Sequence, residues 1–278
     1  MRSELRFFIA LGLCTLTLIY ITWYYPASTN TANLKVGMIY WPIIYNQTDA
    51  LNQLQQIHDD GFRMWETTIS PDIQTGSQGY YTLKACLALA KQLGIETMLA
   101  LDTPYNTNAS RYQEYLNNFV EDFNTIHFGE IDRYVDANEN VTAILQEWYS
   151  HIPNNIPIVI SWTAGYVFNY AQNIKIQLNQ LSNHRIDALG ISVYAKFLPE
   201  VTLPVTYKFL QTFGKPVWVT EIGDHNINWI INQLGILRKN GITKAYIWNW
   251  QTFWGDLNYN IKNTEKETAI KNWLSQSN

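Results

Sequence analysis

From Lys35 to the end of the chain, hydrophobic and polar positions follow one repeating pattern. A short apolar or β-branched run is followed by a polar loop, then by an amphipathic stretch, and then by Gly or Pro before the next apolar run. Short apolar runs bounded by turn residues are typical of buried strands, and longer amphipathic stretches are typical of helices. The apolar runs predict strands over Val36–Tyr40, Phe62–Trp65, Ile95–Asp102, Thr125–Glu130, Pro157–Trp162, Asp187–Tyr194, Pro216–Gly223 and Thr243–Trp250. The amphipathic stretches predict helices over Asp49–Asp59, Tyr80–Leu93, Ser110–Phe123, Asn138–Trp148, Asn169–Leu181, Leu203–Phe213, Asn226–Lys239 and Glu265–Leu274.

This alternation of strands and helices predicts an α/β fold, the (β/α)₈ TIM barrel, as a single domain over residues 34–278. Eight strand–helix units within one chain of this length match the dimensions of that barrel. A doubly wound open sheet is the competing arrangement, and it would need a glycine-rich phosphate turn after the first strand. The chain has Tyr40-Trp41-Pro42 at that place, which favours the barrel.

The first residues differ from the rest of the chain. Arg2 and Arg6 flank one Glu4, and residues 7–25 form an uncharged, mostly apolar run. Such a run approaches the ~20 residues that span a bilayer, which favours an uncleaved signal anchor over a cleaved signal peptide within residues 1–27. Residues 28–33 are expected to form a short tether. Because the positive flank stays in the cytoplasm, we expect an exported barrel that is membrane-anchored and faces outward, or is secreted if the leader is cleaved.

Composition narrows the possible partners. The net charge is −4 and no basic block is present, so nucleic acid is not an expected partner. The two cysteines cannot form a disulfide framework or a Cys-based zinc site, and without a His cluster or an Asp-x-Asp pattern we expect no metal and no cofactor. The chain is expected to be a monomer. Its 11 Trp and 18 Tyr exceed the needs of a core of this size, and such surplus aromatics often form ligand platforms.

Candidate chemistry gathers at the predicted strand ends. In a TIM barrel, catalytic side chains stand at the carboxyl ends of the strands. These ends carry carboxylates interleaved with aromatics: Tyr40, Trp41, Trp65, Glu66, Asp102, Glu130, Asp132, Trp162, Tyr194, Glu221, Trp248 and Trp250. Two acids on one concave face, ringed by flat aromatic side chains that stack on sugars, are what cleavage of a glycosidic bond requires.

Four of these residues stand in motifs that carry a resemblance. Glu130 ends the fourth strand, and Glu221 ends the seventh within Val-Thr-Glu-Ile-Gly. Tyr194 ends the sixth strand in Ile-Ser-Val-Tyr, and Trp248 lies on the eighth in Ile-Trp-Asn-Trp. From about Asn33 onward, the chain resembles the clan-A (4/7) superfamily of retaining β-glycoside hydrolases. The resemblance implies that Glu221 is the nucleophile and Glu130 the general acid/base of a double displacement, a mechanism that places the two carboxyls ~5–5.5 Å apart.

The resemblance also implies supporting roles. Arg63, on the second strand, would lie close to the nucleophile and keep it ionised. Tyr194 would contact the nucleophile, and Trp248 would form the floor under the sugar at the cleavage point. Glu66 and Asp102 are each either a sugar-hydroxyl ligand or part of a polar rim. Further aromatics are either sugar platforms or loop packing: Trp41, Trp65, Trp162 and Trp254.

One position departs from the family pattern. Most of the clan has an Asn before the acid/base, where it bonds the sugar 2-hydroxyl, but this chain has Gly129. Either another donor replaces the Asn, or the substrate contact differs, or the fourth strand is shifted in register and Asp132 holds the role. The departure also keeps open an alternative function, in which a catalytically inactive barrel binds glycans at the cell surface.

Overall fold

The computed structural model describes residues 33–70, 73, 75–101, 110–119, 122–135, 141–194, 202–251 and 257–277. Its strands are β1 (Lys35–Ile39), β2 (Met64–Ile69), β3 (Glu96–Leu101), β4 (Thr125–Phe128), β5 (Ile158–Thr163), β6 (Ala188–Tyr194), β7 (Val217–Gly223) and β8 (Lys244–Ile247). Its α-helices are α2 (Gln47–Asp59), α3 (Gln78–Leu93), α4 (Ser110–Phe119), α5 (Ile131–Tyr134), α6 (Val141–His151), α7 (Ala164–Asn169), α8 (Ala171–Gln180), α9 (Leu203–Gln211), α10 (Ile227–Lys239) and α11 (Glu265–Ser277).

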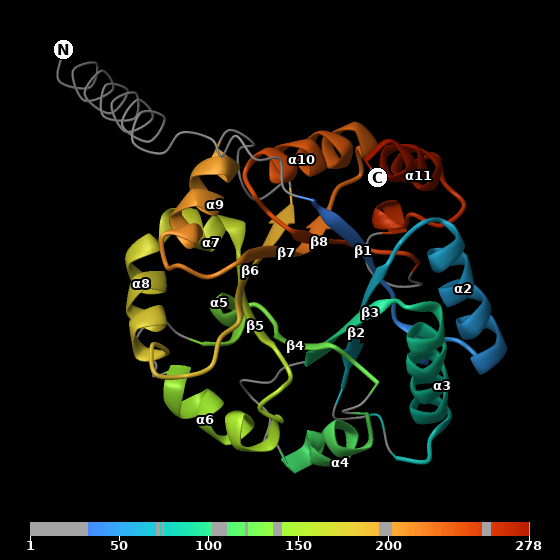
Figure 1. The fold of residues 1–278 in the computed structure, drawn as a ribbon, viewed down its shortest axis with the longest axis horizontal. Helices are drawn as coiled ribbons and strands as arrows, with labels where there is room; N and C mark the ends of the chain where they lie inside the picture. The colour runs from blue at the N-terminus through green and yellow to red at the C-terminus, as the bar shows by residue number, and fades with distance from the viewer. Residues whose placement is uncertain are drawn as a thin grey trace.

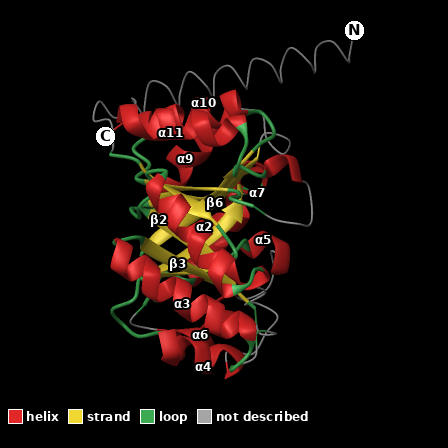
Figure 2. Cartoon of the chain, turned by 90° about the vertical axis from the view of Figure 1, so that its right-hand side faces the viewer, coloured by secondary structure: helices red, strands yellow, loops and turns green. Residues whose placement is uncertain are grey.

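The strands form one closed parallel barrel in sequence order, with β8 paired back to β1. Figure 1 looks along the barrel, with the strands in the centre and the helices around them, and Figure 2 shows the same two layers from the side. The predicted (β/α)₈ fold is therefore confirmed. Parallel neighbours in a barrel require a crossover at each step, and the alternating strands and helices of the sequence supply these crossovers.

Two apolar layers hold the barrel together. Inside it, alternate strand residues form one cluster, made of Ile39, Met64, Met98, Val159, Ala188, Trp218 and Tyr246. The intervening strand residues point outward and pack with the helices in a second, larger cluster. This division follows from the period of two along a strand, which sends successive side chains to opposite faces.

Helix boundaries follow local capping signals. The Ser77 side chain accepts a hydrogen bond from the amide of Tyr80 and begins α3, which ends at Gly94 in the left-handed conformation, with φ 68°. The helix predicted over Asn169–Leu181 is present as α8, and an additional short helix, α7, precedes it. Thr163 directly after the apolar part of β5 caps α7, and the chain leaves the helical conformation at Tyr170.

The predicted leader and most of the predicted tether lie outside the described residues. Within the part of the chain that the structure describes, no helix combines the length and apolar character needed to cross a bilayer. The membrane segment over residues 7–25 therefore stays a prediction from the sequence.

Candidate active site

Three carboxylates reach one cavity at the carboxyl ends of the strands. Glu66 comes from β2, Glu130 follows β4, and Glu221 comes from β7. The cavity has a volume of about 240 Å³, and its other walls are formed by Ile39, Trp41, Thr68, Ala100, Leu101, His127, Gly129, Arg133, Ser192 and Trp248. The structure thus brings together the two acids that the sequence singled out, with a third acid beside them.

A β-bulge aims Glu221 into this cavity. The register between β6 and β7 pairs Ile191 with Val219 but then Ser192 with Glu221, so Thr220 has no partner of its own. Val219 and Ile222 both pack in the outer apolar cluster. Strict alternation from Val219 would turn Glu221 outward as well, and the extra residue of the bulge restores its inward direction.

Glu221 lies in a site that disfavours its negative charge. Burial raises the pKa of its carboxyl to about 8, and the charges of Glu130 and Glu66 act in the same direction. A hydrogen bond from Tyr194 opposes the rise. Tyr194 can lie this close only because β7 carries Gly223, where a Cβ atom would be 2.8 Å from the Tyr194 ring. The predicted contact between Tyr194 and Glu221 is therefore present.

Glu130 is buried and stands directly before the short helix α5. Burial raises the pKa of its carboxyl, while Arg133 and a hydrogen bond from Ser192 oppose the rise. Arg133 forms an ion pair with Glu130 from one turn along α5. The charge of Glu130 in turn raises the pKa of Glu221, so ionisation of one carboxyl disfavours ionisation of the other.

The third carboxylate belongs to a buried chain of polar groups. Glu66 Oε1 lies 2.8 Å from Nδ1 of His127, and Nε2 of His127 lies 2.8 Å from Oγ of Ser161. These residues come from β2, β4 and β5 and all point into the barrel. Burial raises the pKa of Glu66, whereas His127 opposes the rise.

Two tryptophans form one wall of the cavity. The rings of Trp41 and Trp248 meet edge to face, with their centroids 4.8 Å apart. The Trp41 indole nitrogen donates a 3.0 Å hydrogen bond to the hydroxyl of Thr68, which fixes that ring. Trp248 was expected to contact the sugar, and Trp41 either to do so or to pack in a loop; both line the cavity. Their role in stacking on a sugar stays a prediction.

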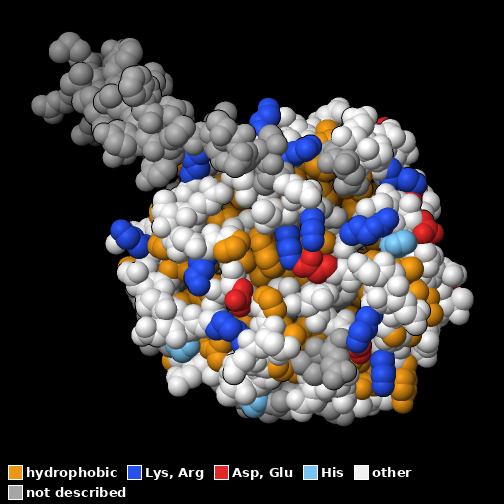
Figure 3. All heavy atoms as spheres, in the orientation of Figure 1, with side chains coloured by type: hydrophobic (Ala, Val, Ile, Leu, Met, Phe, Trp, Pro, Cys, Tyr) orange, Lys and Arg blue, Asp and Glu red, His pale blue; other side chains and the backbone are white. Residues whose placement is uncertain are grey.

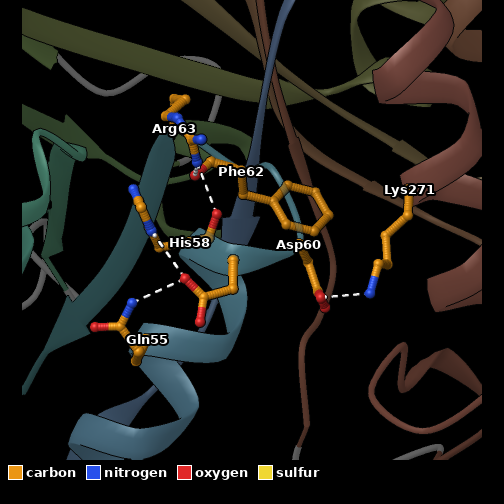
Figure 4. A network of polar contacts seen from close by, with 7 residues as sticks. Gln55, His58, Asp60, Phe62, Arg63 and Lys271 are labelled. Atoms are coloured by element: carbon orange, nitrogen blue, oxygen red, sulfur yellow. Dashed lines mark hydrogen bonds and ion pairs between the residues drawn. The ribbon is translucent and has the colours of Figure 1, made fainter.

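Arg63 does not lie near the nucleophile, contrary to the prediction. It precedes β2 at the amino-terminal end of the barrel, where its guanidinium donates to the backbone oxygens of His58 at 2.7 Å and Phe62 at 3.0 Å (Figure 4). Thr68, five residues further along the chain, lines the cavity. At ~3.3 Å per strand residue, Arg63 and Thr68 are about 16 Å apart along the strand. A cation, Arg133, does line the cavity, but it pairs with Glu130 and not with Glu221.

Arg63 borders a separate hollow of about 770 Å³ at the amino-terminal end of the barrel. Figure 3 looks onto this end, and basic and acidic side chains lie near its centre. The hollow is lined by pairs of opposite charge, such as Lys35 with Glu96 at 3.7 Å and Lys91 with Asp122 at 3.5 Å. It is distant from the three carboxylates.

Trp65 and Trp162 are not available as sugar platforms, which corrects the prediction. Both are fully buried in the outer apolar cluster between strands and helices. The Trp65 indole donates to the Tyr40 carbonyl at 2.9 Å, and the Trp162 indole donates to Gln177 at 3.0 Å. On β2 and β5 they occupy the outward positions of the alternation. The other two predicted ligands, Asp102 and Trp254, lie outside the described residues.

Asp132 does not hold the acid/base position. Its carboxylate accepts hydrogen bonds from the amide of Thr163 at 2.8 Å and from the hydroxyl of Thr163 at 2.6 Å, so it joins α5 to the end of β5. Glu130, and not Asp132, lines the cavity. The register predicted for the fourth strand is therefore correct, and Gly129 is the residue before Glu130 in the site.

Sequence reasoning left three residues without a role in the site: His127, Arg133 and Ser192. A signal for Ser192 was present, because it stands four positions after Ala188, an inward residue of the same strand. For Arg133 the signal was its helical spacing of three residues from Glu130. Among the described residues, no group of His, Cys, Asp and Glu is arranged to hold a metal ion.

Comparison with known proteins supports the fold. No family model matches the chain. No curated protein matches it either. Solved structures do resemble it. The intracellular xylanase TsXylA of Thermoanaerobacterium saccharolyticum, solved with xylotetraose, has a TM-score of 0.57 at 13% identity, over 80% of this chain and 89% of the xylanase.

Two further solved structures share the same fold. The β-mannanase of Thermomonospora fusca, solved with mannohexaose, has a TM-score of 0.62 at 14% identity over 84% of each chain. The GH53 catalytic domain of Ignisphaera aggregans has a TM-score of 0.57 at 14% identity, over 80% of this chain and 86% of the domain. At these identities the likeness establishes the fold, and the predicted resemblance to barrel glycoside hydrolases is confirmed at that level.

Proposed function

We propose that the protein is a glycoside hydrolase that cleaves β-glycosidic bonds of a poly- or oligosaccharide with retention of configuration. The observation that carries this proposal is the convergence of two carboxyls, Glu130 after β4 and Glu221 on β7, on one cavity with a tryptophan wall. The similar barrels of a xylanase and a β-mannanase, solved with xylotetraose and mannohexaose, support a β-glycan substrate.

The reaction proceeds by double displacement. Glu130 gives its proton to the glycosidic oxygen while a carboxylate oxygen of Glu221 attacks the anomeric carbon, so that the bond to the leaving sugar breaks as the glycosyl–enzyme bond forms. Glu130 then takes a proton from water, the water oxygen attacks the anomeric carbon, and Glu221 is released as a carboxylate.

The distribution of protons between the two carboxyls is central to this mechanism. Without substrate, the ion pair with Arg133 favours the ionised form of Glu130, and burial favours the protonated form of Glu221. The reaction needs the reverse distribution. Positive charge that develops at the anomeric carbon favours ionised Glu221, so bound substrate drives the proton towards Glu130 and the leaving oxygen.

Hydrolysis of defined glycans tests the proposal. Wild-type protein and Glu221→Gln are incubated with xylan, mannan, galactan and β-1,3-, β-1,4- and β-1,6-glucans, and the anomer first released is identified by proton NMR. We expect the wild type to release the β-anomer from at least one glycan, and the variant to release none. Release of the α-anomer would contradict the double displacement.

The alternative function is binding without cleavage, at the cell surface. Gly129, in place of an amide side chain before Glu130, is the observation that favours it. The same two proteins distinguish the alternatives when binding is measured by titration calorimetry. If wild type and Glu221→Gln bind a glycan equally and neither cleaves it, the hydrolase proposal is wrong and the binding function is supported.

We further propose that the protein is exported and held at a membrane by residues 7–25, or secreted after cleavage of this leader. Asn33 and Leu34 line the hollow at the amino-terminal end of the barrel. An anchor joined there would leave the carboxylate cavity, at the opposite end, facing away from the bilayer. Alkaline extraction of membranes tests the anchor: full-length protein should stay in the membrane pellet and a variant lacking residues 7–25 should not, whereas a cleaved leader would give a shortened soluble protein.

A further inference from the structure

We infer that Glu66 binds a ring hydroxyl of the sugar at the cleavage point, and that His127 and Ser161 hold Glu66 in position for this contact. The inference rests on the proposed function and deepens it, because it names a third acidic residue for the same cavity. Neither the motifs at the ends of β4 and β7 nor the resemblance assigns a role to a carboxylate on β2.

The position of Glu66 is fixed by its neighbours. Both ring nitrogens of His127 are engaged, one with Glu66 at 2.8 Å and one with Ser161 at 2.8 Å, so the imidazole cannot turn without losing a hydrogen bond. Ser161 is fixed in turn by close packing, because β6 carries Gly190 opposite it and a Cβ there would lie 2.6 Å from the Ser161 Cβ. A carboxylate held in this way keeps one orientation in the cavity wall.

One carboxylate oxygen of Glu66 has no hydrogen-bond partner. The residue is 4% exposed, and Oε2 is buried without a partner among the described residues, whereas Oε1 is occupied by His127. Leaving a buried acceptor unpaired costs about 1–3 kcal/mol, and more when it is charged. Glu66 nevertheless lines the cavity, where a ligand that donates a hydrogen bond would remove this cost.

A sugar hydroxyl is the donor that fits. A carboxylate oxygen can only accept, so it excludes acceptor-only groups such as ethers and favours hydroxyls. The cavity of about 240 Å³ is below the roughly 300–1,000 Å³ of pockets for drug-sized ligands, which agrees with a single ring at this point. Trp248 in the same wall offers an apolar face to such a ring.

The contact belongs to the sugar that carries the scissile bond. Glu66 and Glu221 line the same cavity of about 240 Å³, so a sugar ring that fills this cavity and presents its anomeric carbon to Glu221 can also reach Glu66. Gly129 also lines the cavity, and a Cβ added there would meet no atom within 4 Å. The space that an amide side chain would fill before Glu130 is therefore open, and Glu66 supplies a polar group in the same cavity.

Kinetics on deoxygenated substrates test the inference. Wild type and Glu66→Gln are compared on an aryl β-glycoside of the preferred glycan and on analogues that each lack one hydroxyl of the ring at the cleavage point. A hydrogen bond to a charged group contributes about 1.5–3 kcal/mol, so we expect Glu66→Gln to lower kcat/KM roughly 10- to 150-fold. Removing one particular hydroxyl should cost the wild type a similar factor and cost Glu66→Gln little more.

This non-additivity distinguishes a substrate contact from a structural role. If Glu66 only supports the barrel, the losses from the variant and from each missing hydroxyl will multiply at every ring position, and the inference is overturned. Glu96→Gln is the matched control, because Glu96 also stands inside the barrel and pairs with Lys244, but at the opposite end. It should leave kcat/KM unchanged. If Glu66→Gln does not fold, Glu66→Asp, which keeps the charge but withdraws it by one methylene, is tested in the same way.

Failure of the inference and failure of the proposed function give different results. If wild-type protein hydrolyses no glycan, the proposed function is wrong, and Glu66 is then tested by calorimetry with the intact glycan and its deoxy analogues. Binding that weakens in Glu66→Gln, with no further loss for one deoxy analogue, supports the contact. Hydrolysis by the wild type with multiplicative losses overturns only the role of Glu66, and absence of both hydrolysis and binding overturns both.

Discussion

Replacing Glu221 by Gln should stabilise the folded protein, and should do so increasingly as the pH rises. Burial raises the pKa of Glu221 from its ordinary value of 4.5 to about 8. A carboxyl with a raised folded-state pKa contributes its full stability below the unfolded value, and that stability is lost as the pH rises through the folded value. Glutamine keeps the shape of the protonated acid but cannot ionise, so it avoids this loss.

The size of the effect follows from the two pKa values. A rise from 4.5 to about 8 corresponds to about 5 kcal/mol at roughly 1.4 kcal/mol per pH unit. The carboxyl is partly exposed to the cavity and its ionisation is linked to that of Glu130, so we expect about half of this, roughly 2–3 kcal/mol above pH 8 and close to zero near pH 4.5. A gain of this size, with loss of hydrolysis, would identify Glu221 as a residue that is kept for function at a cost in stability.

Urea unfolding followed by tryptophan fluorescence measures the difference. Wild type, Glu221→Gln and the control Glu265→Gln, which alters an exposed carboxyl on α11, are unfolded at pH 5.0, 6.5 and 8.5. The midpoint of Glu221→Gln should rise above the wild-type midpoint progressively with pH, and the control should follow the wild type. A constant difference between Glu221→Gln and wild type across the three pH values would refute the reasoning.

Three further predictions concern the neighbours of the two acids. Arg133→Gln removes a charge that lowers the pKa of Glu130, so the protonated form of Glu130 should persist to higher pH. The pH at which kcat/KM falls on the alkaline side should therefore increase, and an unchanged pH profile would contradict this. Gly223→Ala places a methyl group 2.8 Å from the Tyr194 ring and should displace that ring from Glu221. It should lower kcat at least about 10-fold, measured by kinetics, and destabilise the fold by about 1–3 kcal/mol, measured by urea unfolding. A normal kcat would mean that the contact of the Tyr194 hydroxyl with Glu221 is not needed. Trp248→Ala should lower kcat/KM for glycans about 10- to 100-fold, because a contact with the sugar ring worth roughly 1–3 kcal/mol is lost. Kinetics equal to those of the wild type would show that Trp248 does not bind the sugar.

The sequence by itself determined the barrel and the two acids. Alternation of short apolar runs with amphipathic stretches is a local property, because side-chain direction has a period of two in strands and 3.6 in helices. Counting these units was enough to place Glu130 after the fourth strand and Glu221 on the seventh. In a parallel barrel, all the carboxyl ends meet at one face, so two acids at strand ends were expected to share a site.

The tertiary structure decided which side chains join them. Arg63 and Arg133 are equally charged in the sequence, but one stands at the start of a strand and the other one helical turn after Glu130, so only the second reaches the cavity. Trp65, Trp162 and Trp248 are the same residue type, each near a predicted strand end, but only Trp248 lines the cavity. Trp65 and Trp162 occupy outward strand positions and are buried against helices. Which face of the sheet a strand residue occupies depends on the register of that strand with its neighbours.

The same reason applies to Glu221 and to Glu66. The bulge that turns Glu221 inward depends on the register between β6 and β7, which no feature of β7 alone specifies. Glu66, His127 and Ser161 come from three strands, and their hydrogen bonds join residues that are 61 and 34 positions apart in the chain. Local pattern fixes which face of a strand a residue occupies, but only closure of the barrel brings such distant residues into contact.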